Sequence, residues 1–303
     1  MDAMRFRRLD LNLLVALDVL LEERNVSRAA HRLHLSQSAM SGALARLRDY
    51  FDDEIMVMVG RSMVPTPLAL TLVEPVRDIL IRVQTTIEAR PTFDPATAQR
   101  AFRIVASDYI TEVVLARAIR QMRRDAPGLR LEISAVADAA HDRLNRGDVD
   151  LVITPNDYLA SDQPKELLFE ETHSCVVWQG NTDVGETLTF ERYLDMAHVV
   201  VVIGDKRTPA FEQWFLDRYG YARKVGAVAP DFSSVAAIVV ETDMISTMHT
   251  RLARLYARHL PLRVLPAPIE FPVMTEMMQW HYQFDRDPGL IWLRGYLREC
   301  AGE

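Results

Sequence analysis

The sequence contains little cysteine, no long apolar run and no excess of positive charge, and each shortage excludes a class of protein. The two cysteines among 303 residues, Cys175 and Cys300, lie far apart and outside any paired motif. Such usage argues against a disulfide scaffold and a zinc ribbon and suits a reducing cytosol. No stretch approaches the roughly 18 apolar residues that a membrane span needs. We expect a cytoplasmic protein without membrane contact or signal peptide, because Asp10, Asn12 and Asp18 interrupt the N-terminal leucine run.

Signatures of catalysis and of tightly bound cofactors are also missing. The sequence has no GxSxG nucleophile turn, no GxGxxG dinucleotide turn, no Walker loop and no HExxH zinc motif. His31 and His34 have the spacing HxxH, but no further metal ligand is evident. We therefore predict no catalytic residue, no metal and no cofactor.

The net charge of −7 alone discourages a nucleic-acid partner, but the charge is unevenly distributed. Residues 1–90 hold 12 basic and 12 acidic side chains, whereas residues 91–303 hold 23 basic and 30 acidic ones. Within the neutral part, five arginines occur between residues 24 and 48 without an intervening acid. Since salt screens charges over about 10 Å, a local basic face on an acidic protein is compatible with docking to phosphates.

Apolar spacing in the first 50 residues predicts three helices. Leucines recur at helical spacing over residues 9–23. Asn25 ends this helix, and Ser27 is the expected N-cap of a short second helix. After a tight turn, Ser36 is the expected N-cap of a third helix that reaches about Tyr50. Two short helices joined by a tight turn behind a supporting helix form a helix-turn-helix.

A small hairpin and a long helix follow. Residues 54–65 alternate around a glycine turn, which predicts a β-hairpin wing. From Pro67 to about residue 89, apolar side chains recur at alternating spacings of four and three, which favours a self-association seam over a helix packed on its own domain. A second apolar row, Leu68, Leu72 and Ile79, is left for the intramolecular contact. The seam begins at Ala69, and its predicted dimerisation residues are Val73, Val76, Leu80, Val83 and Ile87.

Two prolines in the segment 91–95 mark the clearest boundary in the chain and predict a semi-rigid hinge. Beyond the hinge, short strands and helices alternate, with strands predicted near residues 102–106, 131–136 and 151–153. A second series of strand and helix units begins at residue 173. This alternation implies parallel strand pairing and an α/β domain. Two α/β lobes with a ligand between them are the economical arrangement of so many short units.

Seven stretches occur in order along nearly the whole chain. They are LDLNLLVALDVLL (9–21), SRAAHRLHLSQSAMSGALARLR (27–48), VPTP (64–67), FDP (93–95), FRIVASD (102–108), RGDVDLVI (146–153) and IWLR (291–294). With these stretches the chain resembles LysR-type transcriptional regulators, most of all the NodD/NahR-like subgroup. The N-terminal motif is highly specific, and the later ones gain weight as a series.

The resemblance implies an α/β fold with an all-α N-terminal domain plus wing. Its parts are a winged helix-turn-helix (1–66), a dimerising linker helix (67–90), a hinge (91–95) and a two-lobed effector domain like a periplasmic binding protein (96–303). Lobe I is expected at about 96–163 and 268–303, and lobe II at about 164–267. Such regulators usually form homotetramers and activate transcription by RNA polymerase when a small inducer binds. In this subgroup the inducer is typically a flavonoid, a salicylate, a phenol or a hydroquinone.

The chain departs from the family's pattern at three positions that bear on DNA. Ser38 stands where the recognition helix usually has proline, and Gly42 stands where arginine is frequent. Met58 replaces an arginine that is common in the wing, although Arg61 is nearby. The operator sequence of relatives therefore does not carry over to this chain.

The third helix is expected to enter the major groove, where its N-terminal residues meet base edges. Gln37 is the expected base contact, with adenine its best bidentate partner, and Arg61 at the wing tip is expected to enter the minor groove. A solvated helix face is the alternative for each arginine. The predicted DNA-binding residues are Ser27, Arg28, Arg32, Ser36, Gln37, Ser38, Ser41, Arg46, Arg48 and Arg61, of which Ser27, Arg28, Arg32, Arg46 and Arg48 are assigned to phosphates.

Ligands of open α/β sheets bind beyond the carboxyl ends of the strands. Ser107 follows the first predicted strand and is expected to hydrogen-bond the inducer, whereas Asp108 is expected to cap the next helix. Core packing is the alternative for the aromatic residues of this group. The predicted effector-binding residues are Ser107, Asp108, Tyr109, Pro155, Asn156, His173, Phe232, Ser233, Gln279 and Trp280.

These patterns predict a sequence-specific DNA-binding regulator that activates a neighbouring operon for aromatic-compound catabolism. An enzyme or a cytosolic small-molecule-binding protein on the two-lobed fold is the alternative. A solute-binding protein that feeds a transporter is disfavoured by the N-terminal 90 residues.

Overall fold

The computed structural model describes residues 9–60, 62–88, 93–136, 140–159, 162–203, 208–209, 216 and 220–302. The chain divides into two compact units, residues 1–89 and 90–303, which we call the N-terminal and the C-terminal unit. Arg61, part of the predicted hinge and most of a helix predicted over 209–218 lie outside the described residues. None of the described helices is long and apolar enough to cross a membrane.

Three helices open the N-terminal unit. They are α1 (Leu11–Glu23), α2 (Val26–Arg32) and α3 (Gln37–Phe51). Ser36 caps α3 as predicted, because its hydroxyl accepts a hydrogen bond from the backbone N–H of Ala39 at 3.1 Å. The cap of α2 is Asn25, whose side chain accepts from the backbone N–H of Arg28 at 2.9 Å. The prediction of Ser27 as this cap is therefore wrong, since asparagine caps a helix as well as serine does and stands where the helix begins.

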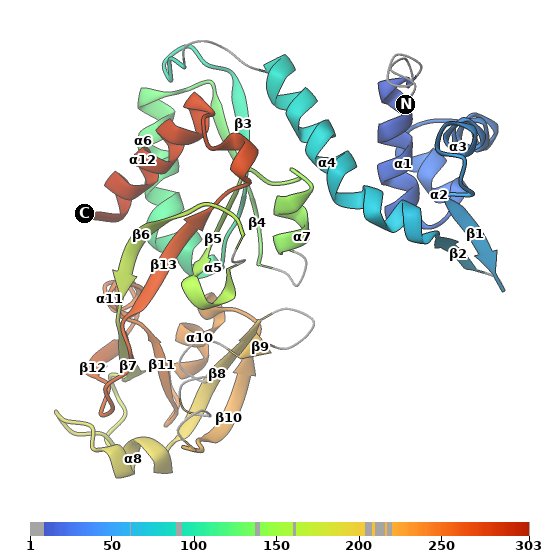
Figure 1. Ribbon diagram of the computed structural model, residues 1–303. Helices are drawn as coiled ribbons and strands as arrows, with labels where there is room; N and C mark the ends of the chain where they lie inside the picture. The colour runs from blue at the N-terminus through green and yellow to red at the C-terminus, as the bar shows by residue number, and fades with distance from the viewer. Residues whose placement is uncertain are drawn as a thin grey trace. The chain divides into compact units, whose positions relative to one another are not determined.

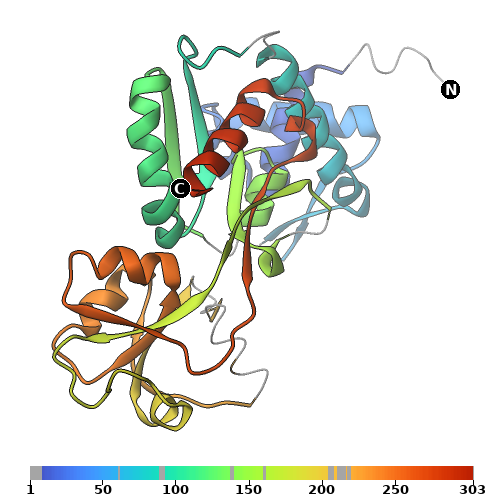
Figure 2. The same ribbon diagram turned by 90° about the vertical axis from the view of Figure 1, so that its left-hand side faces the viewer.

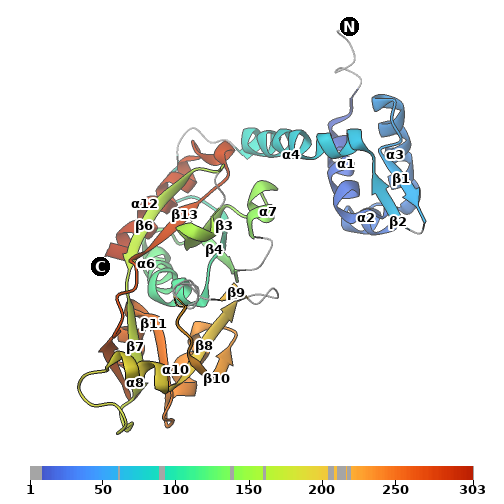
Figure 3. The same cartoon turned by 60° about the horizontal axis from the view of Figure 1, so that its bottom comes forward.

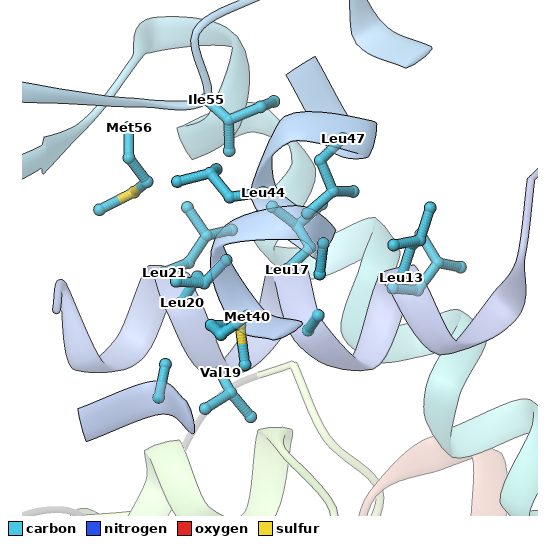
Figure 4. Close-up of a cluster of buried hydrophobic side chains, with 14 of the residues drawn as sticks. Leu13, Leu17, Val19, Leu20, Leu21, Met40, Leu44, Leu47, Ile55 and Met56 are labelled. Carbon is cyan, nitrogen blue, oxygen red and sulfur yellow. The ribbon is translucent and has the colours of Figure 1, made fainter. Parts of the chain in front are cut away.

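Apolar side chains of all three helices and of the start of the hairpin meet in one core (Figure 4). Leu17 and Leu20 of α1 are fully buried, as are Met40 and Leu47 of α3. Each such side chain contributes roughly 1.5–3 kcal/mol to folding. This core fixes which face of α3 points inward and therefore which face remains outside.

The hairpin consists of β1 (Met56–Val59) and β2 (Ser62–Pro65), which pair antiparallel as predicted. Ile55, just before it, has a φ of 59°, a conformation that β-branched residues seldom adopt. Its side chain is fully buried, and its backbone N–H donates to Asp53 while its carbonyl accepts from Thr66. Core packing and these bonds hold the strained turn that places the hairpin beside α3 (Figure 3).

Helix α4 (Pro67–Glu88) begins at the predicted proline. Four members of the predicted seam pack against the unit's own core, namely Ala69, Val73, Val76 and Leu80. In the other row, Leu68 and Ile79 are exposed, as is Ile87 at the end of the seam. Leu72 of the second row packs against the core as predicted. The intramolecular core of the unit therefore also covers most of the predicted seam, and only part of the second row stays exposed. Heptad spacing marks an apolar face without telling which partner covers it.

The first sheet of the C-terminal unit has the strand order β4-β3-β5-β13-β6. Its strands are β3 (Arg100–Val105), β4 (Leu129–Ser134), β5 (Leu151–Pro155), β6 (Lys165–Glu171) and β13 (Met274–Gln279). The first three are parallel, as the βαβ pattern predicts, whereas β13 runs antiparallel to β5 and β6. We call this sheet and its helices lobe I.

The helices of lobe I cover the two faces of its sheet (Figure 1). They are α5 (Asp108–Ile110), a π-helical turn (Thr111–Leu115), α6 (Ala116–Asp125), α7 (Ala140–Asn145) and α12 (Pro288–Gly302). The first three follow one another without a break, so the predicted helix over 109–125 is present with a widened turn inside it. Such π-helical turns occur often at functional sites.

The second sheet has the order β10-β8-β11-β7-β12, with the short β9 (Thr208–Pro209) beside β8. Its main strands are β7 (His173–Trp178), β8 (Ala197–Ile203), β10 (Lys224–Ala229), β11 (Ile245–His249) and β12 (Leu262–Pro266). The helices α8 (Phe190–Asp195), α10 (Phe232–Val239) and α11 (Thr250–Tyr256) pack on it. β7 is antiparallel to both neighbours, so the sheet is mixed rather than parallel throughout. We call this part lobe II.

The chain crosses between the lobes twice, at Thr172 and between β12 and β13 (Figure 2). The predicted boundary at residue 164 is wrong, because β6 pairs with β13 in the sheet of lobe I. The local pattern does not predict β6 as a strand. Its partner lies more than a hundred residues away in sequence, a pairing that no local pattern reveals.

Candidate DNA interface and effector site

The outer face of α3 is polar because its apolar stripe faces the core. Met40, Ala43, Leu44 and Leu47 are buried, and helical periodicity turns the intervening positions outward. Gln37, Ser38 and Ser41 are all exposed on the first turns of the helix. Their side chains therefore form a surface of hydrogen-bonding groups at the N-terminal end of the helix, the part that reads base edges in helix-turn-helix proteins.

Gly42 leaves this surface open. A Cβ atom placed on it would meet no other atom within 4 Å, so the glycine is not required by packing inside the unit. Its φ is not in the left-handed region. A backbone without a side chain at this position permits a close approach of another molecule to α3.

The predicted phosphate-binding arginines are less free than the sequence suggests. Arg28 pairs with Glu23 at 3.1 Å, and Arg32 pairs with Glu22 at 2.9 Å. Arg46 is exposed and lies 3.7 Å from the carboxylate of Asp10. Glu22, Glu23 and Asp10 precede the basic stretch in the sequence, but in the folded protein they form ion pairs with its arginines. Because such exposed pairs contribute little, about 0–1 kcal/mol, they do not prevent exchange for a phosphate.

Arg48 has a different environment from the other three arginines. Its Nε donates to the carbonyl of Glu54 at 2.9 Å, and its Nη2 donates to the carbonyl of Met56 at 3.0 Å. Nε also lies 3.1 Å from the carboxylate of Glu54. These bonds join the end of α3 to the first strand of the hairpin, so Arg48 positions the wing in this structure.

At the boundary between the lobes, Asp108 does not cap its own helix. Ser107 does so, because its hydroxyl accepts from the backbone N–H of Ile110 at 3.2 Å. Asp108 Oδ2 instead accepts hydrogen bonds from Ser233 of lobe II, from its N–H at 2.6 Å and its Oγ at 2.8 Å. The expectation that Asp108 caps its own helix is therefore wrong. The hydroxyl oxygen of Ser107 is used as an acceptor for the backbone N–H of Ile110.

Tyr109 is the centre of a buried cluster at the same boundary. Its ring stacks on His249 with the centroids 3.8 Å apart and meets Phe232 edge-on at 6.2 Å. Its hydroxyl donates to Glu171, the last residue of β6. Burial, followed by the negative charge of Glu171, raises the pKa of the Tyr109 hydroxyl. The tyrosine therefore stays neutral and bridges the two lobes.

Two buried carboxyl groups lie near this tyrosine. Burial raises the pKa of Glu171, although the hydrogen bond from Tyr109 opposes the rise. Burial and the neighbouring Glu171 raise the pKa of Glu276 to about 8. Among the described residues, Glu276 Oε2 has no hydrogen-bond partner. Burial, and to a lesser degree the neighbouring Glu171, therefore favours the protonated form of Glu276 near neutral pH.

His173 lies at the start of β7, directly after the first crossing. It is buried, and burial lowers its pKa to about 4. Its ring centroid lies 5.4 Å from those of His249 and Phe271. His173 is thus a neutral member of the boundary, and His249 lies between it and the predicted residues Tyr109 and Phe232.

The remaining predicted effector residues do not all join this group. Pro155 ends β5 at the boundary edge of the sheet, opposite Glu276, and Asn156 accepts a hydrogen bond from Lys165 at 2.8 Å. Gln279 pairs with Val152 at the opposite end of the same strand pair. The structure therefore separates Gln279 from the boundary, because a strand of six residues carries its two ends far apart.

Trp280 follows Gln279 and belongs to the packing of lobe I. The guanidinium of Arg294 lies 3.6 Å from the centre of its indole ring, and its Nε1 donates to Asp285 at 3.1 Å. Trp280 is 4% exposed. In this structure Trp280 is therefore a packing residue of lobe I, which was the alternative to an effector contact.

Sequence reasoning missed several residues of the boundary. They are Glu112, Glu171, His249, Arg251, Tyr256 and Glu276. Glu112 could have been found, since it lies four residues after Asp108 and such a spacing places both on one helix face. Glu276 also carried a signal, because an acid between the methionines of a buried strand is unusual. The others gain their meaning only from partners far away in sequence.

Two family models match the chain and together span most of it. Residues 11–70 match "Bacterial regulatory helix-turn-helix protein, lysR family", and residues 95–301 match "LysR substrate binding domain". Among curated proteins, the chain is 42% identical over 298 residues to nodulation protein D 1 of Bradyrhizobium diazoefficiens, covering 98% of this chain and 95% of that protein. It is also 42% identical to nodulation protein D 1 of Rhizobium meliloti, covering 98% of this chain and 97% of that protein.

Solved structures agree with these matches. A probable transcriptional regulator from Pseudomonas aeruginosa aligns with a TM-score of 0.65 at 29% identity, covering 97% of this chain and 98% of that one. Full-length OxyR from Pseudomonas aeruginosa aligns with a TM-score of 0.70 at 20% identity, covering 96% and 98%. The second likeness concerns the fold alone. With both of its parts matched by family models and relatives aligned over nearly its whole length, this chain belongs to the LysR family of transcriptional regulators.

Proposed function

We propose that the protein binds an operator through α3 and activates transcription by RNA polymerase when a small aromatic inducer binds between lobes I and II. The single observation that supports DNA reading most strongly is the polar, exposed start of α3, held outward by a fully packed core. Gln37 and Ser41 are assigned to base edges and Arg46 to a phosphate. The protein acts where its DNA lies, in the cytoplasm.

The inducer is proposed to be an uncharged aromatic that carries hydroxyl groups, as phenols, hydroquinones and flavonoids do. Asp108 and Glu112 accept hydrogen bonds from Ser233 at the lobe boundary, and Asp231 accepts one from the neighbouring Ser234. A carboxylate ligand such as a salicylate would meet their like charge. The cluster of Tyr109 and Phe232 offers aromatic faces. Thermal-shift measurements with each class test this: we expect stabilisation by uncharged hydroxylated aromatics, and a shift with salicylates alone would contradict it.

The curated relatives bear the name nodulation protein D, which does not support the catabolic operon predicted from the sequence. The target operon is therefore left out of the proposal. What remains is a regulator whose ligand class follows from the charge and the aromatic content of the lobe boundary.

Self-association is proposed to use the outer side of α4, as a dimer or as a pair of dimers in a tetramer. Leu68, Ile79 and Ile87 are exposed there, between 38% and 79%, and an apolar helix face of this kind needs a partner. A symmetric dimer would present two copies of α3 to half-sites about one helical turn of DNA apart, or a multiple of it.

A gel-shift titration on the DNA upstream of the protein's own gene tests the DNA reading. Replacing Gln37 and Ser41 with alanine should weaken specific binding by about 1–3 kcal/mol for each base-edge interaction that the substitution removes. Gln179→Ala, which removes an exposed glutamine of lobe II, serves as the matched control and should leave binding unchanged. An unchanged affinity of the folded Gln37→Ala, Ser41→Ala protein would refute the proposal.

A further inference from the structure

The lobes of the C-terminal unit are joined by two chain crossings, by Arg251 of α11, which donates to the carbonyl of Ala301 in α12 at 2.6 Å, and by a separate group of polar contacts around Ser233. Asp108 Oδ2 accepts from the N–H and Oγ of Ser233 at 2.6 and 2.8 Å. Glu112 Oε1 accepts from Ser233 Oγ at 2.7 Å and from Tyr256 Oη at 2.7 Å. Every acceptor lies on lobe I and every donor lies on lobe II.

The first helical segment of lobe I carries the carboxylates of both Asp108 and Glu112. Asp108 and Glu112 lie four residues apart on one continuous helical segment, so their side chains project from the same face. Ser107 already caps this helix, and Asp231 already caps α10 through the N–H of Ser234 at 2.8 Å. Asp108 is therefore not needed for either helix end and remains available to the opposite lobe.

Three donor hydrogens serve the two carboxylates. They come from the backbone N–H and the hydroxyl of Ser233 and from the hydroxyl of Tyr256. A serine hydroxyl has one hydrogen, so Ser233 Oγ donates to Asp108 and Glu112 in turn. In the part of the chain that the structure describes, no Lys or Arg forms an ion pair with either acid. Hydrogen bonds to charged acceptors are the stronger ones, and here they are made entirely across the lobes.

These contacts differ in kind from those near the crossings. There, Thr172 and Thr250 hydrogen-bond through side chain and backbone, and Tyr109 stacks on His249 in a buried site. The group around Ser233 is partly open to solvent, so water can replace its bonds when the lobes separate. It is the part of the boundary that can break without exposing core.

We propose that Asp108 and Glu112 form a releasable latch which, by accepting hydrogen bonds from Ser233 and Tyr256, holds lobes I and II in the arrangement described here. The latch sets how often the lobes separate in the protein by itself. This inference goes beyond the proposed inducer site and does not depend on it, because the latch contains only groups of the chain.

Distances between spin labels in the full-length protein test the latch. Arg124 on α6 and Arg258 after α11 are exposed, one on each lobe, and replacing them with cysteine provides the labelling sites, while the native Cys175 and Cys300 are buried. Labelled protein is diluted with unlabelled protein to suppress distances between copies. In the otherwise unchanged chain we expect one narrow distance distribution.

The double variant Asp108→Ala, Glu112→Ala should lower the ratio of the narrow distance to displaced distances roughly tenfold, the factor expected when charged hydrogen bonds are removed. Ser233→Ala and Tyr256→Phe should each act in the same direction. Adding Ser233→Ala to the double variant should change little further, because both acceptors of the Ser233 hydroxyl are already absent from it. Circular dichroism melting curves verify that each variant is folded.

Two matched controls remove the same groups elsewhere. Asp142→Asn takes an exposed acid from lobe I, and Tyr221→Phe takes an exposed phenol from lobe II; both should leave the distances unchanged. The proposal is overturned if the double variant keeps the narrow distribution, or if the controls broaden it equally. Failure here leaves the inducer proposal standing, and a negative ligand screen leaves the latch standing.

Discussion

The two units differ in how the surfaces proposed to be functional are assembled. In the N-terminal unit, the polar face of α3 comes from consecutive residues and is set by a cap and a stripe within one helix. In the C-terminal unit, the boundary joins partners that are far apart: Asp108 and Ser233 are separated by 125 residues, and Glu112 and Tyr256 by 144. The periodicity of apolar residues predicts a surface formed by one helix, whereas it does not predict a surface formed by residues distant in sequence.

The units differ in the setting of their charges as well. The ion pairs of Arg28 and Arg46 are exposed, where charges are readily exchanged for other partners. Glu171 and Glu276 are buried, and burial changes the pKa of both. DNA docking needs charges that can be shared with phosphates, whereas a lobe boundary ties its charges to internal contacts.

The largest expected effect tests whether the two units unfold separately. Leu20→Ala empties a fully buried position in the N-terminal core and should lower that unit's unfolding free energy by about 2–5 kcal/mol. All four tryptophans lie in the C-terminal unit, so in urea the fluorescence transition should stay in place while the helical circular dichroism signal shifts. Leu11→Ala, at a 46% exposed position of the same helix, is the control. A matching shift in fluorescence would show that the units do not unfold independently.

The second effect belongs to the buried acids of the C-terminal unit. Glu276 has a pKa raised from 4.5 to about 8, so the folded state binds its proton more tightly than the unfolded chain. The stability that the proton supplies is complete below about pH 4.5 and is lost as pH rises through about 8. From pH 6.5 to 8 the unfolding free energy should therefore fall by about 2 kcal/mol.

Tryptophan fluorescence in urea measures this slope. Glu276→Gln should remove it, and Glu186→Gln, at an exposed position, should leave it. The range begins at pH 6.5 because His173 acts with the opposite sign below it: its pKa is lowered from 6.5 to about 4, so its contribution is lost as pH falls. A slope that persists in Glu276→Gln would assign the pH dependence to other groups.

The smallest effects separate the two arginines at the end of α3. Arg48→Ala removes a charged donor from two carbonyl groups and should lower the unfolding free energy of the N-terminal unit by about 1 kcal/mol. Arg46→Ala should leave stability nearly unchanged, since its ion pair is exposed. In operator titrations it should reduce the slope of log affinity against log salt by about 0.9, the amount that one neutralised phosphate supplies. Equal slopes for Arg46→Ala and the parent protein would show that Arg46 does not bind the DNA.

Much of the N-terminal unit was predictable from the sequence, and the errors of that prediction concern single caps and one helix face. Ser36 as a cap and the hairpin over 54–65 are confirmed, because turn and cap residues act on their immediate neighbours. Ser27 is displaced by Asn25, a choice between two good caps. Most of the predicted seam of α4 packs on the core of its own unit, since an apolar row has the same spacing whether its own core or another chain covers it.

The C-terminal unit shows where prediction from sequence ends. The order of strands and helices and the place of Ser107 beyond a strand followed from local patterns. β6, the antiparallel β13 and the separation of Gln279 from the other candidates did not, because they depend on pairing between distant strands. Asp108 was predicted at the boundary but with the wrong task, since its true partner is Ser233 of the other lobe.

The amino-acid sequence alone determined the helix-turn-helix and the alternation of strands and helices. Both arise from residues that lie close to one another in the sequence. Tertiary structure decided which arginines are engaged, which side of α4 stays exposed and which acids have a raised pKa. Those outcomes depend on solvent exclusion and on contacts between remote segments, and neither exists before the chain has folded.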